Sequence, residues 1–340
     1  MTSTATSPEA ASGVRAAEIT YAQAIADTLA AEMDRNPLVF VMGEDVGAHG
    51  GVFRATAGLF ERFGPDRVRD TPISESAILG AGVGAALTGM RPVVEIQYSD
   101  FLMECMDQVV NQLAKVRYMS GGQVSAPLVV RAPGGRARSS ASQHSQSIES
   151  WFVSVPGLQI AMPATPSDAK GLLTTALRGL DPVLFLEHKL LYRTKGRVPD
   201  GEHLVPFGQA AVRRKGSDVT VVSASWMAQE AVAAAETLAG DGISAEVIDL
   251  RTLVPLDIDT VLDSVSRTGR LLVAHEAPVQ GGWGGEVVSL VTERLFRSLK
   301  APPARVGARH APVPMAPLLE DAVVPSASWI VDAAQRLLAA

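Results

Sequence analysis

The chain has 340 residues, of which 47% are hydrophobic and only 19% are charged, and this composition excludes a disordered chain. A length of 340 residues, at about 150 per domain, predicts two domains. Lys and Arg number 30 against 36 Asp and Glu, which gives a net charge of −6 and argues against nucleic-acid binding.

Further function classes are excluded by what the sequence lacks. Cys105 is the one cysteine, so neither an intramolecular disulfide nor a cysteine-based metal cluster can form, and we expect a reducing, cytoplasmic location. No stretch reaches the ~20 continuous apolar residues of a membrane helix, so no membrane contact is expected. Residues 1–13 have neither a signal-peptide core nor a transit-peptide pattern, and we expect residues 1–16 to form a flexible tail.

Strand-like and helix-like segments alternate along the chain. In chain order we predict a helix over 19–35, a strand over 38–42, a helix over 76–88, a strand over 92–96, a helix over 101–118, a strand over 128–131, a helix after 168 and a strand over 183–186. A polar, proline-containing linker at 195–207 follows, and then strand 219–223, helix 227–239, strand 245–250, helix 257–266, strand 270–274 and helix 285–299. This alternation predicts an α/β fold with two three-layer α/β/α sandwich domains and mainly parallel sheets, at residues 17–200 and 201–340.

The segment Thr71-Pro-Ile-Ser-Glu75 comes directly before a helix rich in Gly and Ala. Ser74 is a good N-cap residue, and Glu75 then falls in the first turn, where the helix dipole favours a carboxylate. One interpretation of Glu75 is a capping carboxylate. The other is proton transfer, because Gly80, Gly82 and Gly84 weaken the helix and indicate that something large packs closely against it.

Other candidates follow predicted strands, where open α/β sheets bind ligands. Glu44 follows strand 38–42, Gln97 and Phe101 follow strand 92–96, and His144 ends a long loop after strand 128–131. The alternatives are an exposed turn acid for Glu44, loop polarity for Gln97, a core aromatic for Phe101 and a structural role for His144. His188 and His275 also follow strands, and for both we favour a structural role.

The sequence contains no complete dinucleotide-binding motif and no complete magnesium–diphosphate motif. The run 281–285 is rich in glycine but lacks the acid that a dinucleotide site needs about 20 residues later. Gly240-Asp-Gly242 imitates the start of the magnesium–diphosphate motif of thiamine enzymes, but the Asn that completes the motif is missing, since Asn36 and Asn111 both lie upstream. We therefore predict no metal site within this chain.

Several motifs together resemble one family. TPISE, EIQYSDF, DQVVNQLAKVRYMSGG, QHSQS and VIDLRTLVPLD are similar to the beta subunit of the thiamine diphosphate-dependent, decarboxylating component of 2-oxo acid dehydrogenases. GGVFRAT, LEHKLLYR and TGRLLVAHEAP look most like the branched-chain type. The resemblance implies a transketolase-like pyrimidine-binding domain over 17–200, a transketolase C-terminal-like domain over 201–340 and oxidoreductase activity.

The resemblance also implies roles for the candidate residues. Glu75 matches the glutamate that hydrogen-bonds the aminopyrimidine ring of thiamine diphosphate, and Glu44 matches a second acid beside it. Ile73 and Phe101 match positions that pack around the ring, and Gln97 matches a channel position. His144 matches a histidine that assists formation of the intermediate and acyl transfer to lipoamide. Phe101 is more typical of the pyruvate type, and the loop before His144 has fewer glycines than is usual.

The partners implied by the resemblance are an alpha subunit, in a two-alpha two-beta heterotetramer that is active only with that subunit, and a lipoyl acyltransferase core. The alpha subunit supplies the magnesium site, and the substrate is a small 2-oxo acid. Whether the chain binds a structural potassium ion stays open, because Gly179 and Asp181 replace the residues usual at that site. The alternatives are a pyruvate or acetoin dehydrogenase subunit and, outside the enzymes, a diverged scaffold that only binds an alpha-like partner.

Overall fold

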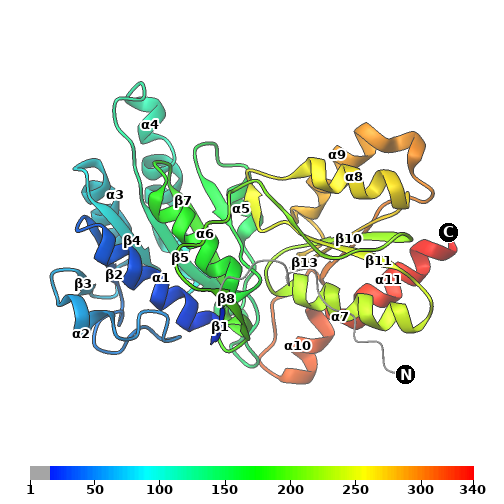
Figure 1. Ribbon diagram of the computed structural model, residues 1–340, viewed down its shortest axis with the longest axis horizontal. Coiled ribbons are helices and arrows are strands. Elements are labelled where there is room, and N and C mark those ends of the chain that lie inside the picture. Colours follow the sequence, from blue (N-terminus) through cyan, green and yellow to red (C-terminus); the bar gives the residue numbers. More distant parts are fainter. Residues whose placement is uncertain (1–15) are drawn as a thin grey trace.

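A computed structural model describes residues 16–340, which form two α/β parts that lie side by side (Figure 1). The predicted tail, residues 1–16, lies outside the described residues except for Ala16, which begins β1 (Ala16–Thr20). No helix in the described part of the chain is both long enough and apolar enough to cross a bilayer.

The first sheet has seven strands in the order β12-β6-β7-β5-β4-β2-β3. Their bounds are β2 (Val39–Gly43), β3 (Val68–Asp70), β4 (Arg91–Glu95), β5 (Val129–Gly134), β6 (Gln159–Ala161), β7 (Val183–His188) and β12 (Thr252–Val254). All neighbours are parallel except β12, which runs antiparallel to β6. The central strands are buried along almost their whole length because helices cover both faces.

One face of this sheet packs on α1 (Tyr21–Arg35) and α6 (Pro166–Arg178), and the other on α3 (Glu75–Leu87) and α5 (Glu149–Val153). Two short helices, α2 (Leu59–Phe63) and α4 (Val116–Met119), lie nearer the edges.

The single helix predicted over 101–118 is wrong in its backbone. The segment folds as the 3-10 helix η1 (Ser99–Cys105), the π-helix η2 (Gln108–Leu113) and then α4. Its inward face was predicted well, since Leu102, Val109 and Leu113 are buried. The spacing of apolar residues determines which face is buried. It does not encode whether the backbone hydrogen bonds link residues three, four or five apart, as in 3-10, α- and π-helices.

The second sheet, in the order β14-β13-β10-β11-β9, belongs to the C-terminal half, by which we mean residues 201–340. Its strands are β9 (Ala211–Arg214), β10 (Val219–Ser223), β11 (Ala245–Asp249), β13 (Leu271–Pro278) and β14 (Ala304–Ala308). The helices α7 (Trp226–Gly240) and α11 (Ala327–Ala339) pack on one face, and α8 (Ile258–Thr268) and α9 (Gly284–Leu295) on the other. The sequence did not predict β14, α11 or α10 (Pro317–Val323).

The predicted linker at 195–207 begins as a strand instead. The strand β8 (Lys195–Pro199) pairs antiparallel with β1 over five residue pairs. The partner lies about 180 residues earlier in the sequence, so local composition carries no sign of this pairing.

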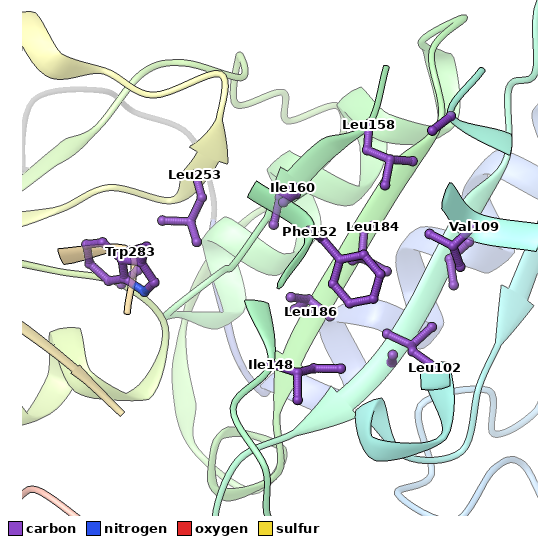
Figure 2. Close-up of a cluster of buried hydrophobic side chains, with 14 of the residues drawn as sticks. Leu102, Val109, Ile148, Phe152, Leu158, Ile160, Leu184, Leu186, Leu253 and Trp283 are labelled. Carbon is purple, nitrogen blue, oxygen red and sulfur yellow. The ribbon is translucent and has the colours of Figure 1, made fainter. Parts of the chain in front are cut away.

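One apolar core crosses the boundary between the two parts (Figure 2). Phe152 is fully buried against the first sheet, and the same cluster includes Leu253 and Trp283 from the C-terminal half. Because β12 also completes the first sheet, the two parts are joined by apolar packing and by backbone hydrogen bonds.

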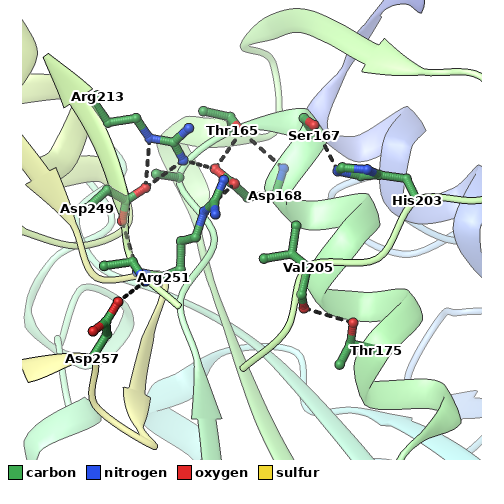
Figure 3. A network of polar contacts seen from close by, with 12 residues as sticks. Thr165, Ser167, Asp168, Thr175, His203, Val205, Arg213, Asp249, Arg251 and Asp257 are labelled. Carbon is green, nitrogen blue, oxygen red and sulfur yellow. Dashed lines mark hydrogen bonds and ion pairs between the residues drawn. The ribbon is translucent and has the colours of Figure 1, made fainter. Parts of the chain in front are cut away.

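A buried ionic network joins the same two parts (Figure 3). Asp168 in α6 is paired with Arg213 from β9, and its other oxygen lies 2.8 Å from Arg251 Nε. Arg213 also donates to Asp249 at 2.7 Å. Burial raises the pKa of Asp249 to about 6 in spite of this guanidinium. With packing and charge both crossing the boundary, side chains of the C-terminal half are held at fixed places beside loops of the first sheet.

Candidate active site

The candidate residues gather at one edge of the first sheet. Glu44 directly follows β2, Gln97 follows β4, and His144 lies in the short 3-10 helix η3 (Ser142–His144) that follows β5. Since β5, β4 and β2 are adjacent and parallel, their carboxyl ends lie at the same edge. This is the edge at which such sheets bind ligands.

Glu75 is the first residue of α3, in the turn that we predicted, and it is half-buried. Ser74 occupies the N-cap position but makes no side-chain capping bond. The segment before the helix is tied to β2, because the amide of Thr71 donates to the carbonyl of Gly43 at 3.0 Å. The residue after Gly43 is Glu44, so this bond brings the two acids of the candidate site close to each other.

The charge of Glu75 acts on the carboxyl group of Glu44. Glu44 is buried, and burial raises its pKa; the negative charges of Glu75 and Asp45 raise it further. Close carboxyl groups favour a state in which one of them keeps a proton. A pair of this kind can hold a proton and release it within one site.

The glycines of α3 have different surroundings. A Cβ on Gly82 would lie 2.6 Å from Val94 Cγ2 and 2.9 Å from Leu128 Cδ1, so this glycine lets the helix approach the sheet closely. A Cβ on Gly84 would meet no atom within 4 Å. The predicted close packing is therefore confirmed at Gly82 and is absent at Gly84 within the described chain.

Phe101 and His144 lie together in an aromatic cluster. The His144 ring lies edge-on to Phe101, with centroids 5.4 Å apart, and to Tyr98, at 4.8 Å. The rings of Tyr98 and Phe101 are themselves 5.5 Å apart. A histidine ring that packs against two aromatic rings has few orientations, and a fixed orientation is what a proton-transferring ring requires.

The acid pair and the aromatic cluster lie on neighbouring elements. The hydroxyl of Ser76, at the start of α3, donates to the carbonyl of Glu104 in η1. Burial raises the pKa of Cys105 in η1 to about 12, and the charges of Glu75 and Glu104 add to the effect. The same 3-10 helix carries Phe101, so it contacts both groups of candidate residues.

The outer side of the site is open. Ile73, two residues before Glu75, exposes 83% of its surface, and Gln97 is half-buried. This side of the site is therefore accessible to another molecule.

The sequence interpretation missed Lys189. Its ammonium group is buried, donates to the carbonyl of His144 and lies 5.3 Å from the centre of the Tyr98 ring. Burial lowers its pKa to about 8. Its place just after β7, at the same sheet edge, was the available signal.

The other two candidate histidines, His188 and His275, lie in the protein interior. His188 Nε2 lies 2.8 Å from Glu276 of the C-terminal half. His275 is buried, with Nδ1 2.9 Å from the carbonyl of Ala277, and burial lowers its pKa to about 4. Both contacts are consistent with the structural roles that we favoured.

Comparison with protein families identifies both parts of the chain. Residues 17–195 match the transketolase pyrimidine-binding domain, and residues 208–330 match the transketolase C-terminal domain. A solved structure titled "Split gene transketolase, inactive beta4 tetramer" is similar with a TM-score of 0.77, covering 94% of this chain and 98% of that one. Its identity is 21%, so it supports the fold alone.

Curated relatives are similar over nearly their whole length. The 2-oxoisovalerate dehydrogenase subunit beta of Bacillus subtilis is 47% identical, covering 94% of this chain and 98% of the relative. The acetoin:2,6-dichlorophenolindophenol oxidoreductase subunit beta of Cupriavidus necator is 46% identical, with 93% and 96% covered. The pyruvate dehydrogenase E1 component subunit beta of Bacillus subtilis is 44% identical, with 95% and 99% covered.

Proposed function

Because this chain belongs to the family of E1 beta subunits of 2-oxo acid dehydrogenases, we propose that it catalyses the oxidative decarboxylation of branched-chain 2-oxo acids together with an alpha subunit. The acyl group would then pass to a lipoyl group of an acyltransferase core. The observation that carries this proposal is the pair Glu44 and Glu75 at the edge of the sheet, beside the cluster that holds His144.

Thiamine diphosphate, when bound, would supply the nucleophilic carbon and the electron sink for decarboxylation. The residues of the open edge fit its aminopyrimidine ring in their chemistry. Glu75 would accept or donate a proton at a ring nitrogen, and the neighbouring Glu44 would help to keep that proton within the pair. Ile73, Phe101 and Gln97 would give apolar and polar contacts around the ring.

His144 would act on the substrate side as a proton donor and acceptor. The rings of Phe101 and Tyr98 pack against its imidazole, and Lys189 holds its backbone carbonyl. Within residues 16–340 these contacts restrict the imidazole without a hydrogen bond to its ring nitrogens, which leaves them accessible for proton transfer.

The alpha subunit would hold magnesium and the diphosphate, because the motif at Gly240 lacks its asparagine. The segment considered for potassium is already in contact with cationic side chains. Arg91 donates to the carbonyls of Leu177 and Gly179 at 2.9 and 2.8 Å, and Arg117 pairs with Asp181. These residues do not form an open cation site, and we assign no role to potassium.

A heterotetramer with two alpha and two beta chains is part of the proposal. It is supported by the exposed Ile73 and by α3, whose Gly84 leaves space on the outer side of the helix. We also keep a boundary near residue 200 between the pyrimidine-binding and C-terminal domains, which the two family matches at 17–195 and 208–330 support.

The branched-chain substrate rests on the motifs GGVFRAT and LEHKLLYR. Identities of 47, 46 and 44% to the three kinds of relative do not separate the substrates, and Phe101 is more typical of the pyruvate type. Co-expression with the alpha partner, followed by rates on 2-oxoisovalerate, pyruvate and acetoin, tests the proposal. We expect 2-oxoisovalerate to give the largest kcat/KM, and a larger value for pyruvate or acetoin would overturn the substrate proposal.

A further inference from the structure

The loop from residue 135 to residue 147 carries His144, and its backbone is unusual. Three of its residues that are not glycine have positive φ: Arg138 at 53°, Ser139 at 69° and Ala141 at 59°. A Cβ makes this conformation unfavourable, and glycine is the residue that usually adopts it. The loop therefore needs contacts from outside to keep this shape.

Glu320 supplies two of these contacts from the C-terminal half. Its side chain lies in α10 and is 1% exposed. Its two oxygens accept hydrogen bonds from the amides of Arg138 and Ser139, at 3.2 and 3.0 Å. Successive amides in this backbone conformation converge on one side, where a carboxylate satisfies both.

Glu276 in β13 holds the two ends of the same loop. It accepts hydrogen bonds from the amide of Arg136 at 2.7 Å and from the hydroxyl of Ser147 at 3.2 Å, and its other oxygen lies 2.8 Å from His188 Nε2. Burial would raise its pKa, but His188 and the Arg136 amide lower it overall, which favours the ionised acceptor. Gly135 has a φ of +75°, and a Cβ there would overlap His188 and Glu276, so the loop enters this contact through a glycine.

We propose that Glu276 and Glu320 are positioning residues for His144: they fix the glycine-poor loop in the conformation that presents the imidazole to the active site. The assignment rests on the proposed function for the role of His144, but the loop contacts themselves are independent of it. The C-terminal half is thereby part of the catalytic apparatus of the first sheet, although it supplies no side chain to the acid pair.

Hydrogen–deuterium exchange of the full chain, with and without the alpha partner, measures the loop directly. Glu320→Gln keeps the shape of the side chain but removes its charge and one of its two acceptor oxygens. We expect the amides of residues 137–146 to exchange about five- to thirtyfold faster in this variant, while β10 keeps its wild-type rate. Unchanged loop exchange would overturn the proposal.

A glycine substitution tests whether Glu320→Gln acts by leaving the strained loop backbone without support or by a general loss of structure. In Glu320→Gln, a second change, Ser139→Gly, replaces a residue at positive φ with the one that favours it. We expect loop exchange to return toward the wild-type rate. If exchange stays fast, or if β10 exchanges faster as well, Glu320 does not act through the loop backbone.

Glu276→Gln provides an independent variant and should speed exchange of the Arg136 amide, which donates to Glu276. Glu293→Gln, on an exposed position of α9, is the matched control and should leave loop exchange unchanged.

Activity of the assembly gives a second readout. With the alpha partner, Glu320→Gln should lower the kcat for acyl transfer to a lipoyl domain by about tenfold, and Ser139→Gly should restore most of it. An unchanged kcat would refute the link to His144. If the wild-type assembly is inactive on every 2-oxo acid, the proposed function fails, while the exchange experiment still decides what holds the loop.

Discussion

Arg131 is a fully buried guanidinium beneath the active-site edge. It lies in β5 between two acids of the neighbouring strands, with Nε 2.6 Å and Nη2 2.8 Å from the oxygens of Glu187 and Nη1 2.5 Å from Glu95. Tyr192 also donates to Glu187, at 2.5 Å. Arg131→Met keeps most of the volume and leaves both carboxylates without their cation.

We expect Arg131→Met to lower the free energy of unfolding by about 3–5 kcal/mol, because two buried acids lose one shared partner. An unfolding entropy of about 2.1 cal/mol/K per residue gives about 1.4 °C per kcal/mol for a chain of 340 residues, so the Tm should fall by roughly 4–7 °C. Arg117→Met is the control, since Arg117 and Asp181 expose 49% and 45% of their side chains. Loss of this exposed pair should cost less than about 1 kcal/mol.

The loss of unfolding free energy in Arg131→Met should also depend on pH. Burial already raises the pKa of Glu95 in spite of Arg131, and removing the guanidinium should raise it further. A carboxyl whose pKa is higher in the folded state stabilises the fold below its unfolded pKa and loses this contribution as pH rises through the folded value. Urea unfolding at pH 5.5 and 8 should therefore show the larger deficit at pH 8. A loss of stability no larger than that of Arg117→Met, or one that shrinks as pH rises, would show that Arg131 does not neutralise the two buried acids.

Two further predictions concern packing and charge near the site. Gly82→Ala should lower the free energy of unfolding by about 1–3 kcal/mol, because its Cβ would overlap Val94 and Leu128, whereas Gly84→Ala should raise that of the isolated chain by up to about 1 kcal/mol. Urea midpoints measure both changes, and a reversed order would contradict the packing described for α3. Lys189 loses its proton near pH 8 in the folded chain but near 10.5 when unfolded, so wild-type stability relative to Lys189→Met should rise between these values. Thermal unfolding of the two proteins across this range tests the prediction, and a flat difference would show that the ammonium is not buried.

The sequence predicted the parts of the fold that local patterns encode. Strand 219–223 and the helix that ends at Arg35 were placed within two residues, because continuous apolar runs and helical spacing are local signals. The pairing of β1 with β8 and the insertion of β12 beside β6 depend on partners far along the chain. No local pattern records such pairings, so the linker at 195–207 was predicted where a strand begins.

In the candidate site, too, local patterns predicted some residues, and contacts between distant parts of the chain decided the rest. Glu44 and Phe101 were found from their position after strands, and the structure places the first beside Glu75 and the second against His144. Lys189 was missed because a lysine after a strand is ordinary until its neighbours are known. The glycine-poor loop before His144 looked unfavourable in sequence, because the carboxylates that compensate its backbone lie in the other half of the chain.

The central claim is that Glu75 performs proton transfer at a site completed by a second chain. Glu75→Gln, assembled with the alpha partner and supplied with thiamine diphosphate, tests it most directly, with the neighbouring Glu104→Gln as a control. We expect an intact assembly whose kcat for decarboxylation of 2-oxoisovalerate falls about 10²–10⁴-fold, while Glu104→Gln stays within about twofold of wild type. An assembled Glu75→Gln enzyme with the wild-type rate would contradict it.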